Sequence, residues 1–263
     1  MSGHVLVVGV DGTRFDALGP DSTPAIWSLD RLAPVIIDEG THSWSGPCWA
    51  TIATGVPMTL HNVVGNDLTG HRLASYPDFL TLATRAGLPT LLAVSGWPPL
   101  AVTEDGGPMF AEVTRREFVP VAVEHDVAEW DAADEAITTL ACGLLAADAP
   151  QLSFVYLGAV DINGHMGGVD PAYHAAVRVA DQRVGRLVAA VRSRPSAEDW
   201  TIVVVTDHGH VDEGGHGGRE PEVLTAWAAV SGADVPMVSS QRDIAPLVLG
   251  AVGVAGRLAE GAY

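Results

Sequence analysis

Short apolar runs rich in valine, isoleucine and leucine recur along the chain and alternate with longer amphipathic stretches. The apolar runs are 5–10, 90–94, 152–157, 201–205 and 225–230. Uninterrupted apolar runs of this length are typical of strands that are buried on both faces of a parallel sheet. The stretches between them predict helices over 23–32, 77–86, 130–146, 171–191 and 242–252. This alternation predicts an α/β fold, with a single doubly wound, mostly parallel sheet flanked by helices.

The segment 96–123 departs from this alternation, because it contains Trp97-Pro98-Pro99 and the turn-forming run Glu104-Asp105-Gly106-Gly107-Pro108. We expect it to form a long loop or a small cap near the functional site. The chain shows no internal repeat and no low-complexity linker. A single domain over residues 1–263 is therefore expected.

Charge and composition narrow the function classes. The net charge is −18, and all 14 basic residues are Arg because Lys is absent. Nucleic-acid binding requires clustered positive charge, so we expect no nucleic-acid partner. No apolar run approaches the ~20 residues of a membrane span, and the N-terminus has no pattern of a signal peptide. With two Cys and no disulfide framework, these features favour a cytoplasmic protein without a membrane partner.

Acidic residues follow three of the predicted strands. Asp11, Asp161 and Asp207 each come after an apolar run, and the carboxyl ends of parallel strands meet at one edge of a sheet. Histidines stand close to these acids: His165 lies four residues after Asp161, His208 follows Asp207 directly, and His216 lies in a glycine-rich loop. Carboxylate together with imidazole is the ligand set of Zn²⁺, with Mn²⁺ or Fe as alternatives.

A hydroxyl completes this set. Ser45 lies in the turn-like sequence Ser45-Gly46-Pro47-Cys48-Trp49. Three Asp, three His and one hydroxyl are what two divalent cations require around a covalent nucleophile. Nearby hydroxyls at Thr41, Ser43 and Thr51 are alternatives to Ser45. His42, His61 and His210 are expected to support ligands or to be structural.

The order of these motifs resembles the alkaline phosphatase superfamily, and most of all its nucleotide pyrophosphatase/phosphodiesterase branch. The motifs, in chain order, are Asp11-Gly12, Ser45 with the downstream Thr54-Gly55 and His61, Asp161 to His165, Asp207-His208-Gly209, and Gly215-His216-Gly217. The resemblance implies an alkaline phosphatase-like core. It also implies that Asp161, His165 and His216 hold one cation, while Asp11, Asp207 and His208 hold the other with the oxygen of Ser45.

The resemblance leaves the substrate contacts less defined. The branch carries an Asn three residues after its nucleophile, and Cys48 stands at that place here. Arg14, Cys48 and Trp49 are therefore the candidate substrate-binding residues, with Trp44 and Trp97 as further residues that could stack on a base. Cys48 could also suggest a sulfatase, whose Cys is converted to formylglycine, but the Cys-x-Pro-x-Arg context is missing.

The expected function is hydrolysis of phosphate esters through a phosphoseryl intermediate at Ser45, with two divalent cations as cofactors. Phosphodiester or nucleotide pyrophosphate bonds are favoured, because a diester needs an apolar pocket for its second group and basic residues near the motifs are scarce. The alternatives are a phosphomonoesterase acting on a nucleoside monophosphate or another small metabolite, and a metal-binding protein without catalytic activity.

Overall fold

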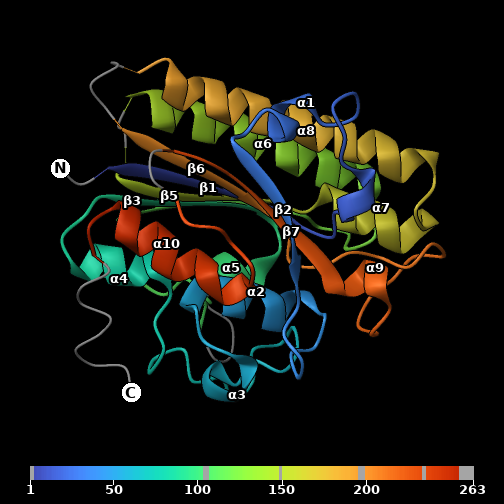
Figure 1. The fold of residues 1–263 in the computed structure, drawn as a ribbon, viewed down its shortest axis with the longest axis horizontal. Coiled ribbons are helices and arrows are strands. Elements are labelled where there is room, and N and C mark those ends of the chain that lie inside the picture. The colour runs from blue at the N-terminus through green and yellow to red at the C-terminus, as the bar shows by residue number, and fades with distance from the viewer. Residues whose placement is uncertain (1–2, 103–106, 148–149, 195–198, 233–234, 255–263) are drawn as a thin grey trace.

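A computed structural model describes residues 3–102, 107–147, 150–194, 199–232 and 235–254. Seven strands form one sheet in the order β2-β7-β6-β1-β5-β3-β4. Their bounds are β1 His4–Val10, β2 Arg31–Ile36, β3 Thr90–Gly96, β4 Arg115–Pro120, β5 Leu152–Leu157, β6 Trp200–Val205 and β7 Thr225–Ser231. β1 therefore lies in the middle of the sheet, between β5 and β6 (Figure 1).

The sheet is parallel from β6 to β4 and antiparallel at its other side. β1 pairs in parallel with β5 and with β6, and β3 pairs in parallel with β5 and β4. β7 runs antiparallel to both β6 and β2. The predicted fold class, a mostly parallel sheet of the alkaline phosphatase type, is confirmed.

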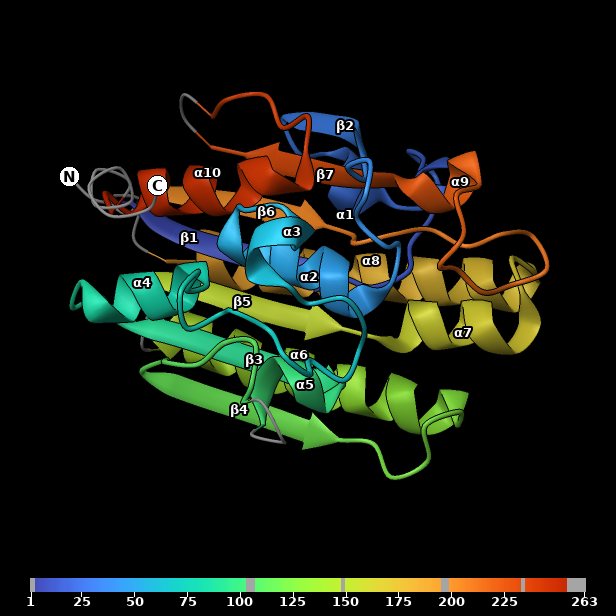
Figure 2. The same ribbon diagram turned by 90° about the horizontal axis from the view of Figure 1, so that it is seen from below.

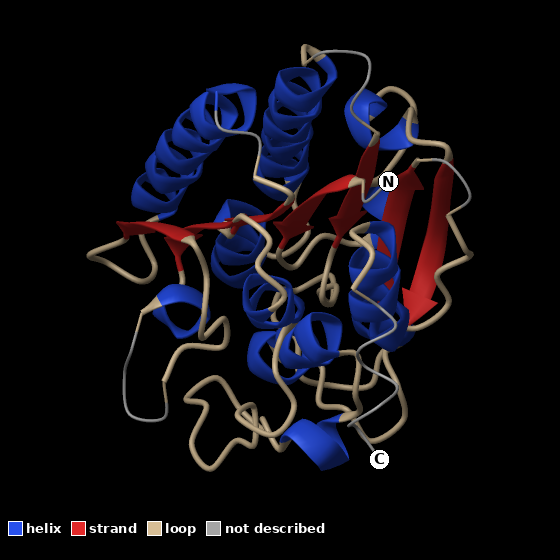
Figure 3. Ribbon diagram, turned by 90° about the vertical axis from the view of Figure 1, so that its left-hand side faces the viewer, coloured by secondary structure: helices blue, strands red, loops and turns tan. Residues whose placement is uncertain are grey.

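Helices cover both faces of the sheet, as the edge-on view in Figure 3 shows. The α-helices are α1 Pro24–Trp27, α2 Ser45–Thr54, α3 Met58–His61, α4 Phe79–Arg85, α5 Pro98–Ala101, α6 Val127–Ala147, α7 Ala159–Gly167, α8 Pro171–Arg192, α9 Pro221–Leu224 and α10 Ile244–Ala251. Two 3₁₀ turns are η1 Phe15–Ala17 and η2 Gln241–Asp243. α6 and α8 lie on one face, while α2, α4, α5 and α10 lie on the other (Figures 1 and 2).

The two helical layers create two hydrophobic cores, and β1 contributes to both. Val5 and Val7 pack into the core beneath α2 and α10. Leu6, Val8 and Val10 point to the opposite side, into the core beneath α6 and α8. Successive side chains of a strand alternate between faces, so a strand covered on both sides must be apolar throughout. This explains the uninterrupted apolar runs of the sequence.

The predicted strands agree with the structure to within two residues, but two edge strands were missed. The predicted helix 23–32 is wrong beyond its first turns: α1 ends at Trp27, and β2 begins at Arg31. β2 contains Pro34 and is half exposed, as an edge strand tolerates. Its partner β7 comes late in the sequence, so local patterning gave no sign of this pairing.

The segment 96–123 is not a separate cap. It contains α5 and the edge strand β4, whose parallel pairing with β3 attaches the segment to the main sheet. Residues 103–106, within the predicted loop, lie outside the described residues. The ends of the segment do reach the cavity described below. None of the described helices is long and apolar enough to cross a membrane.

Candidate metal centre

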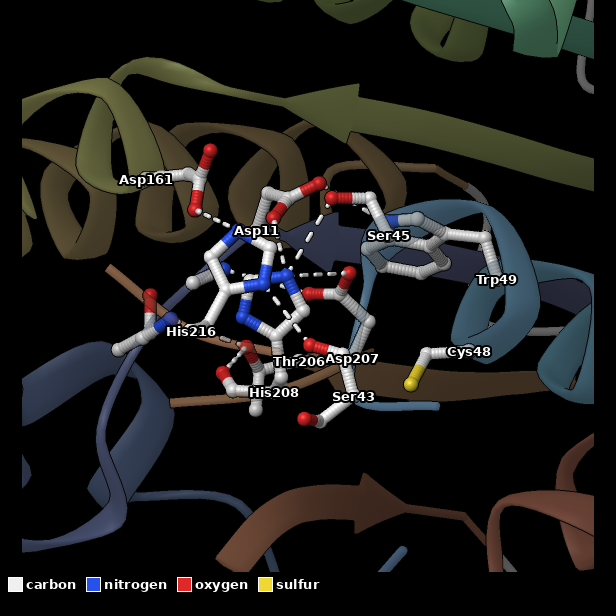
Figure 4. Close-up of polar contacts among 12 residues, drawn as sticks. Asp11, Ser43, Ser45, Cys48, Trp49, Asp161, Thr206, Asp207, His208 and His216 are labelled. Atoms are coloured by element: carbon white, nitrogen blue, oxygen red, sulfur yellow. Dashed lines mark hydrogen bonds and ion pairs between the residues drawn. The ribbon is translucent and has the colours of Figure 1, made fainter. Parts of the chain in front are cut away.

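The carboxyl ends of β1, β5 and β6 bring the predicted acids together. Asp11 directly follows β1, Asp207 lies two residues after β6, and Asp161 lies in the first turn of α7, just after β5. Because these strands are adjacent in the sheet, the three carboxylates meet at one edge (Figure 4). Among the described residues, three groups of side chains have potential ligand atoms within 4.8 Å of one another, and two of these groups consist of the residues of the predicted sets.

The first set consists of Asp11, Asp207 and His208, all buried. His208 Nε2 lies 3.3 Å from Asp207 Oδ2 and 3.6 Å from Asp11 Oδ1. Both of these carboxylate oxygens are buried and have no hydrogen-bond partner. Burial and the charge of Asp161 raise the pKa of Asp11 to about 7, and burial and the charge of Asp11 raise the pKa of Asp207 well above its usual value.

Two buried carboxylates, each with one unpartnered oxygen, are unfavourable side by side without a compensating charge. A divalent cation between Asp11, Asp207 and His208 would supply that charge and occupy the free oxygen atoms. The donor set of this group therefore fits a metal ion.

The second set consists of Asp161, His165 and His216. Asp161 and His165 lie one turn apart on α7, so both face the same side of the helix. His165 Nε2 lies 3.4 Å from Asp161 Oδ2 and 3.0 Å from His216 Nε2. Burial raises the pKa of Asp161, but hydrogen bonds with His165 and His210 outweigh this effect and lower the pKa well below its usual value.

Backbone carbonyls fix which ring nitrogen of two histidines is free to coordinate. Nδ1 of His208 lies 3.2 Å from the carbonyl oxygen of Gly209, and Nδ1 of His216 lies 2.8 Å from that of Ser43. A carbonyl can only accept, so each Nδ1 carries the proton and each Nε2 presents a lone pair. A carbonyl behind the ring is the usual arrangement for a histidine that binds a metal through Nε2.

Ser45 stands at the edge of the first set. It is the first residue of α2 rather than part of a free turn. Its Oγ lies 3.3 Å from His208 Nε2, and the residue is 6% exposed. Gly46 follows, and an added Cβ there would lie 2.2 Å from the carbonyl oxygen of Gly65. The close approach of the loop containing Gly65 thus requires glycine beside the serine.

A cavity of about 660 Å³ opens beside this serine. It extends from the candidate metal ligands to the ends of the segment 96–123. Its described lining residues are Trp44, Ser45, Asn66, Gly96, Trp97, Pro98, Pro99, Val121, Ala122, Glu124, His125, Trp130, Tyr156, Asp161, Ile162, His165 and His216. None of these is Arg, and the chain has no Lys. The cavity therefore combines a polar end beside the ligands with an aromatic and proline-rich end.

Two of the predicted substrate contacts, Cys48 and Trp49, have side chains that do not line the cavity. Cys48 is fully buried in α2, and its Sγ lies 3.4 Å from the carbonyl oxygen of His42. Figure 4 shows its sulfur well apart from the Ser45 hydroxyl. Trp49 is 1% exposed and donates from Nε1 to Asp11 Oδ2 at 2.8 Å. Both side chains follow α2 into the core, away from the position of Ser45.

Arg14 does not line the cavity either. Its guanidinium binds Asp16 and Asp212, with distances of 2.5 Å to a carboxylate oxygen of each. It also donates to the carbonyl oxygen of His210 at 3.4 Å. The hydrogen bond to Asp16, and after it the contact with Asp212, raise the pKa of Arg14. The predicted phosphate contact is not supported, because the guanidinium is committed to these acids.

Asn66 is a candidate that the sequence analysis missed. It lines the cavity beside Ser45, and its Oδ1 accepts a hydrogen bond of 2.8 Å from the backbone N–H of Gly46. With the oxygen so engaged, the NH₂ group is left to donate. The loop that carries Asn66 has no regular pattern, so no sequence signal pointed to this residue.

Other proteins with this fold include a 2-O GAG sulfatase, with a TM-score of 0.70 and 12% identity over 96% of this chain and 71% of that one. A putative sulfatase from Bacteroides thetaiotaomicron has a TM-score of 0.71 and 12% identity, again over 96% of this chain and 71% of that one. Murine ectonucleotide pyrophosphatase/phosphodiesterase 5 has a TM-score of 0.55 and 22% identity over 78% of this chain and 57% of that one. This chain thus spans less than two thirds of the murine protein. At these identities the likeness concerns the fold alone.

No curated protein matches the sequence. A family model described as type I phosphodiesterase/nucleotide pyrophosphatase matches residues 5–239, a span that includes both ligand sets and Ser45. Family membership supports a hydrolase that acts on phosphate esters. The match covers most of the chain, and the chain therefore belongs to the type I phosphodiesterase/nucleotide pyrophosphatase family within the alkaline phosphatase superfamily.

Proposed function

We propose that this protein is a two-metal hydrolase of phosphodiester or nucleotide pyrophosphate bonds, and that Ser45 is its nucleophile. One observation carries the proposal: the Ser45 hydroxyl lies at the meeting point of the first ligand set and the cavity, 3.3 Å from His208 Nε2. A protein that merely bound metal would have no need of a hydroxyl at this point. We expect Zn²⁺ in both sets, with Mn²⁺ or Fe as alternatives.

Once bound, two cations would lower the pKa of the Ser45 hydroxyl and offset the negative charge on the phosphoryl oxygens. Asp11, Asp207 and His208, together with the Ser45 oxygen, would hold one cation. Asp161, His165 and His216 would hold the other. The unpartnered oxygens of Asp11 and Asp207, and the lone pairs of His208 and His216, support this assignment.

The reaction has two halves. Ser45 Oγ loses its proton and bonds to phosphorus, while the bond between phosphorus and the leaving oxygen breaks and that oxygen takes up a proton. Water then attacks the phosphoseryl ester, Ser45 regains a proton, and a phosphate monoester is released. Asn66 would donate from Nδ2 to a non-bridging oxygen, and the N-terminus of α2 would favour the same negative charge.

The cavity supports a diester over a monoester. A monoester dianion needs positive side chains around its terminal oxygens, and none of the described lining residues is Arg. A diester carries an organic group, and Trp44, Trp97 and the neighbouring prolines offer it an apolar surface. An inactive variant of murine ectonucleotide pyrophosphatase/phosphodiesterase 5 has been solved with AMP. We therefore include nucleotides among the proposed substrates.

The test compares turnover of a nitrophenyl monoester with turnover of a nitrophenyl diester, in the metal-loaded enzyme and in Ser45→Ala. We expect the diester to be cleaved at least about tenfold faster in kcat/KM, which is ~1.4 kcal/mol of differential transition-state binding. Ser45→Ala should abolish turnover of both esters. Ser43→Ala is the matched control, because Ser43 lies two residues away and its hydroxyl donates to the carbonyl oxygen of Gly218.

Faster cleavage of the monoester would identify a phosphomonoesterase instead. Near-native rates in Ser45→Ala would place the nucleophile elsewhere. If the metal-loaded enzyme cleaves neither ester, the proposal of a phosphoester hydrolase fails.

A further inference from the structure

His210 is a fully buried histidine that touches both segments of the second ligand set. Its Nε2 lies 2.8 Å from Asp161 Oδ1, on α7. Its Nδ1 lies 3.1 Å from the backbone nitrogen of Gly215, which immediately precedes His216. One ring thus connects the helix that carries Asp161 to the loop that carries His216.

The partners of this ring determine where its proton lies. The backbone N–H of Gly215 can only donate, so His210 Nδ1 must be the unprotonated acceptor. The proton is then on Nε2, and Nε2 donates it to Asp161. This tautomer is the reverse of the one that backbone carbonyls impose on His208 and His216. A protonated Nε2 has no lone pair for a metal ion, so His210 differs in kind from those two residues.

The surroundings hold the ring in this position. An added Cβ at Gly12 would lie 2.7 Å from His210 Nε2, and one at Gly164 would lie 2.7 Å from the ring carbon Cε1 and from Nε2. Two backbone segments therefore enclose the ring at distances that only glycine permits. Behind it, Arg14 donates to the carbonyl oxygen of His210 and binds Asp212.

We infer that His210 is a positioning residue for the cation of Asp161, His165 and His216. It orients the Asp161 carboxylate through Nε2 and holds the His216 loop through Nδ1, and it does not coordinate the cation. The inference rests on the proposed function in one respect, namely that Asp161 and His216 are metal ligands. It also gives Arg14 a role, because Arg14 fixes the backbone of His210 instead of binding phosphate.

The same residues allow one competing arrangement. Ligand atoms of Asp161, His208 and His210 also lie within 4.8 Å of one another. In that arrangement His210 would itself be a ligand, its Nε2 would lose the proton, and the bond from Nε2 to Asp161 would be absent. The two arrangements differ in the protonation of one nitrogen atom, which can be measured directly.

The first experiment is long-range ¹H–¹⁵N NMR of the protein loaded with ¹¹³Cd²⁺. We expect His210 to show a protonated Nε2, an unprotonated Nδ1 and no coupling to cadmium, while His165, His208 and His216 show cadmium coupling. Cadmium coupling to His210 would overturn the inference. This readout does not depend on turnover, so it holds even if neither test ester is cleaved.

The second experiment measures Zn²⁺ affinity by chelator competition in three variants. His210→Phe removes both nitrogens, His210→Gln keeps a donor near Nε2, and His210→Asn keeps an acceptor near Nδ1. We expect His210→Phe to weaken one of the two cations about 10- to 100-fold while the other is unchanged. His210→Gln and His210→Asn should each recover part of that loss.

Thermal unfolding of the metal-free variants shows whether each of them folds. If His210→Phe is unfolded, the Zn²⁺ affinities of His210→Gln and His210→Asn still test the positioning role. Wild-type affinity in both of these variants would overturn the positioning role. Complete loss of one cation in both would identify His210 as a ligand and would overturn it as well.

Discussion

The indole nitrogen of Trp49 donates a 2.8 Å hydrogen bond to Oδ2 of Asp11. The hydroxyl of Tyr156 donates to the same oxygen at 2.6 Å. These two bonds leave Oδ1 of Asp11 as the free atom, 3.6 Å from His208 Nε2. Gly9 makes the arrangement possible, since an added Cβ there would lie 2.5 Å from the Trp49 ring. Trp49, which the sequence suggested as a substrate contact, thus orients a candidate metal ligand.

Trp49→Phe should therefore weaken metal binding rather than substrate binding. The ring would still fill most of the space above Gly9, but Asp11 would lose one of its two donors. We expect about a tenfold or greater loss of affinity for the cation of Asp11, Asp207 and His208. Zn²⁺ titration against a chelator measures this. Trp97→Phe is the control, because Trp97 lines the cavity, and it should change KM and leave metal affinity intact.

The two ligand sets should lose their metals separately. We expect Asp161→Asn and His216→Ala to empty one position, and Asp207→Asn to empty the other, because the ligand atoms of each set converge on their own point. Anomalous diffraction at the zinc edge would show which position loses density. Equal loss of both ions in every variant would disprove the division of the ligands into these two sets, but it would not contradict the binding of two metal ions.

Asn66→Asp should reduce turnover of the diester. The carboxylate keeps an acceptor for the Gly46 N–H but replaces the donating NH₂ group with negative charge close to the phosphoryl oxygens. Loss of one donor to developing negative charge typically costs about 10²- to 10³-fold in kcat, and we expect an effect of that order. Steady-state kinetics of the metal-loaded enzyme measures it.

Cys48→Ala serves as the control for the Asn66 substitution, because Cys48 occupies the place where the sequence suggested the phosphate contact. Its thiol is buried and should leave kcat nearly unchanged. A large loss of kcat in Cys48→Ala together with normal kinetics in Asn66→Asp would reverse the assignment.

The sequence was sufficient to predict the parts of the protein that local chemistry determines. Apolar runs predicted the five inner strands, and an acid at the end of a strand predicted where Asp11, Asp161 and Asp207 meet. The edge strand β2 was missed because its hydrogen-bond partner β7 is distant in the chain. The residues that line the cavity were also predicted incompletely, because their positions depend on tertiary packing.

Helix α2 explains that misjudgement. Ser45 is the first residue of α2 and lines the cavity, while Cys48 and Trp49 lie about one turn further along the same face, where that face is buried in the core. Neighbours in the sequence of Ser45 are thus not its neighbours in the cavity. Asn66 reaches the cavity from a loop whose position depends on tertiary packing. The spacing of residues along the chain therefore could not predict that Asn66 lies beside Ser45.

Buried His61 should make stability depend on pH. Its Nδ1 accepts from the N–H of Val63, its Nε2 lies 3.1 Å from Thr51 Oγ1, and burial lowers its pKa to about 4. The unfolded chain has a histidine pKa of about 6.5, so it binds more protons than the folded chain between these values. The contribution of His61 is therefore fully present above about pH 6.5 and is lost as the pH falls towards 4, by up to about 3 kcal/mol.

Denaturant unfolding of the wild type and of His61→Gln at several pH values would measure this contribution. Asp11, whose pKa is raised to about 7, also titrates near this range, so the relevant quantity is the difference between the two proteins. We expect the free energy of unfolding of the wild type to approach, and then fall below, that of His61→Gln as the pH decreases. A constant difference from pH 7 to pH 4 would contradict the role given to His61.

The central place of β1 has a consequence for the synthesis of the chain. β1 is synthesised long before its partners Leu152–Leu157 and Trp200–Val205. Until then this largely apolar strand has two unpaired edges, the condition in which chains associate with one another. Asp11 is likewise separated from Asp207 and His208 for the whole of this interval. An incomplete chain is therefore open to association through β1, and the proposed cation site of Asp11, Asp207 and His208 can form only after His208 has been synthesised.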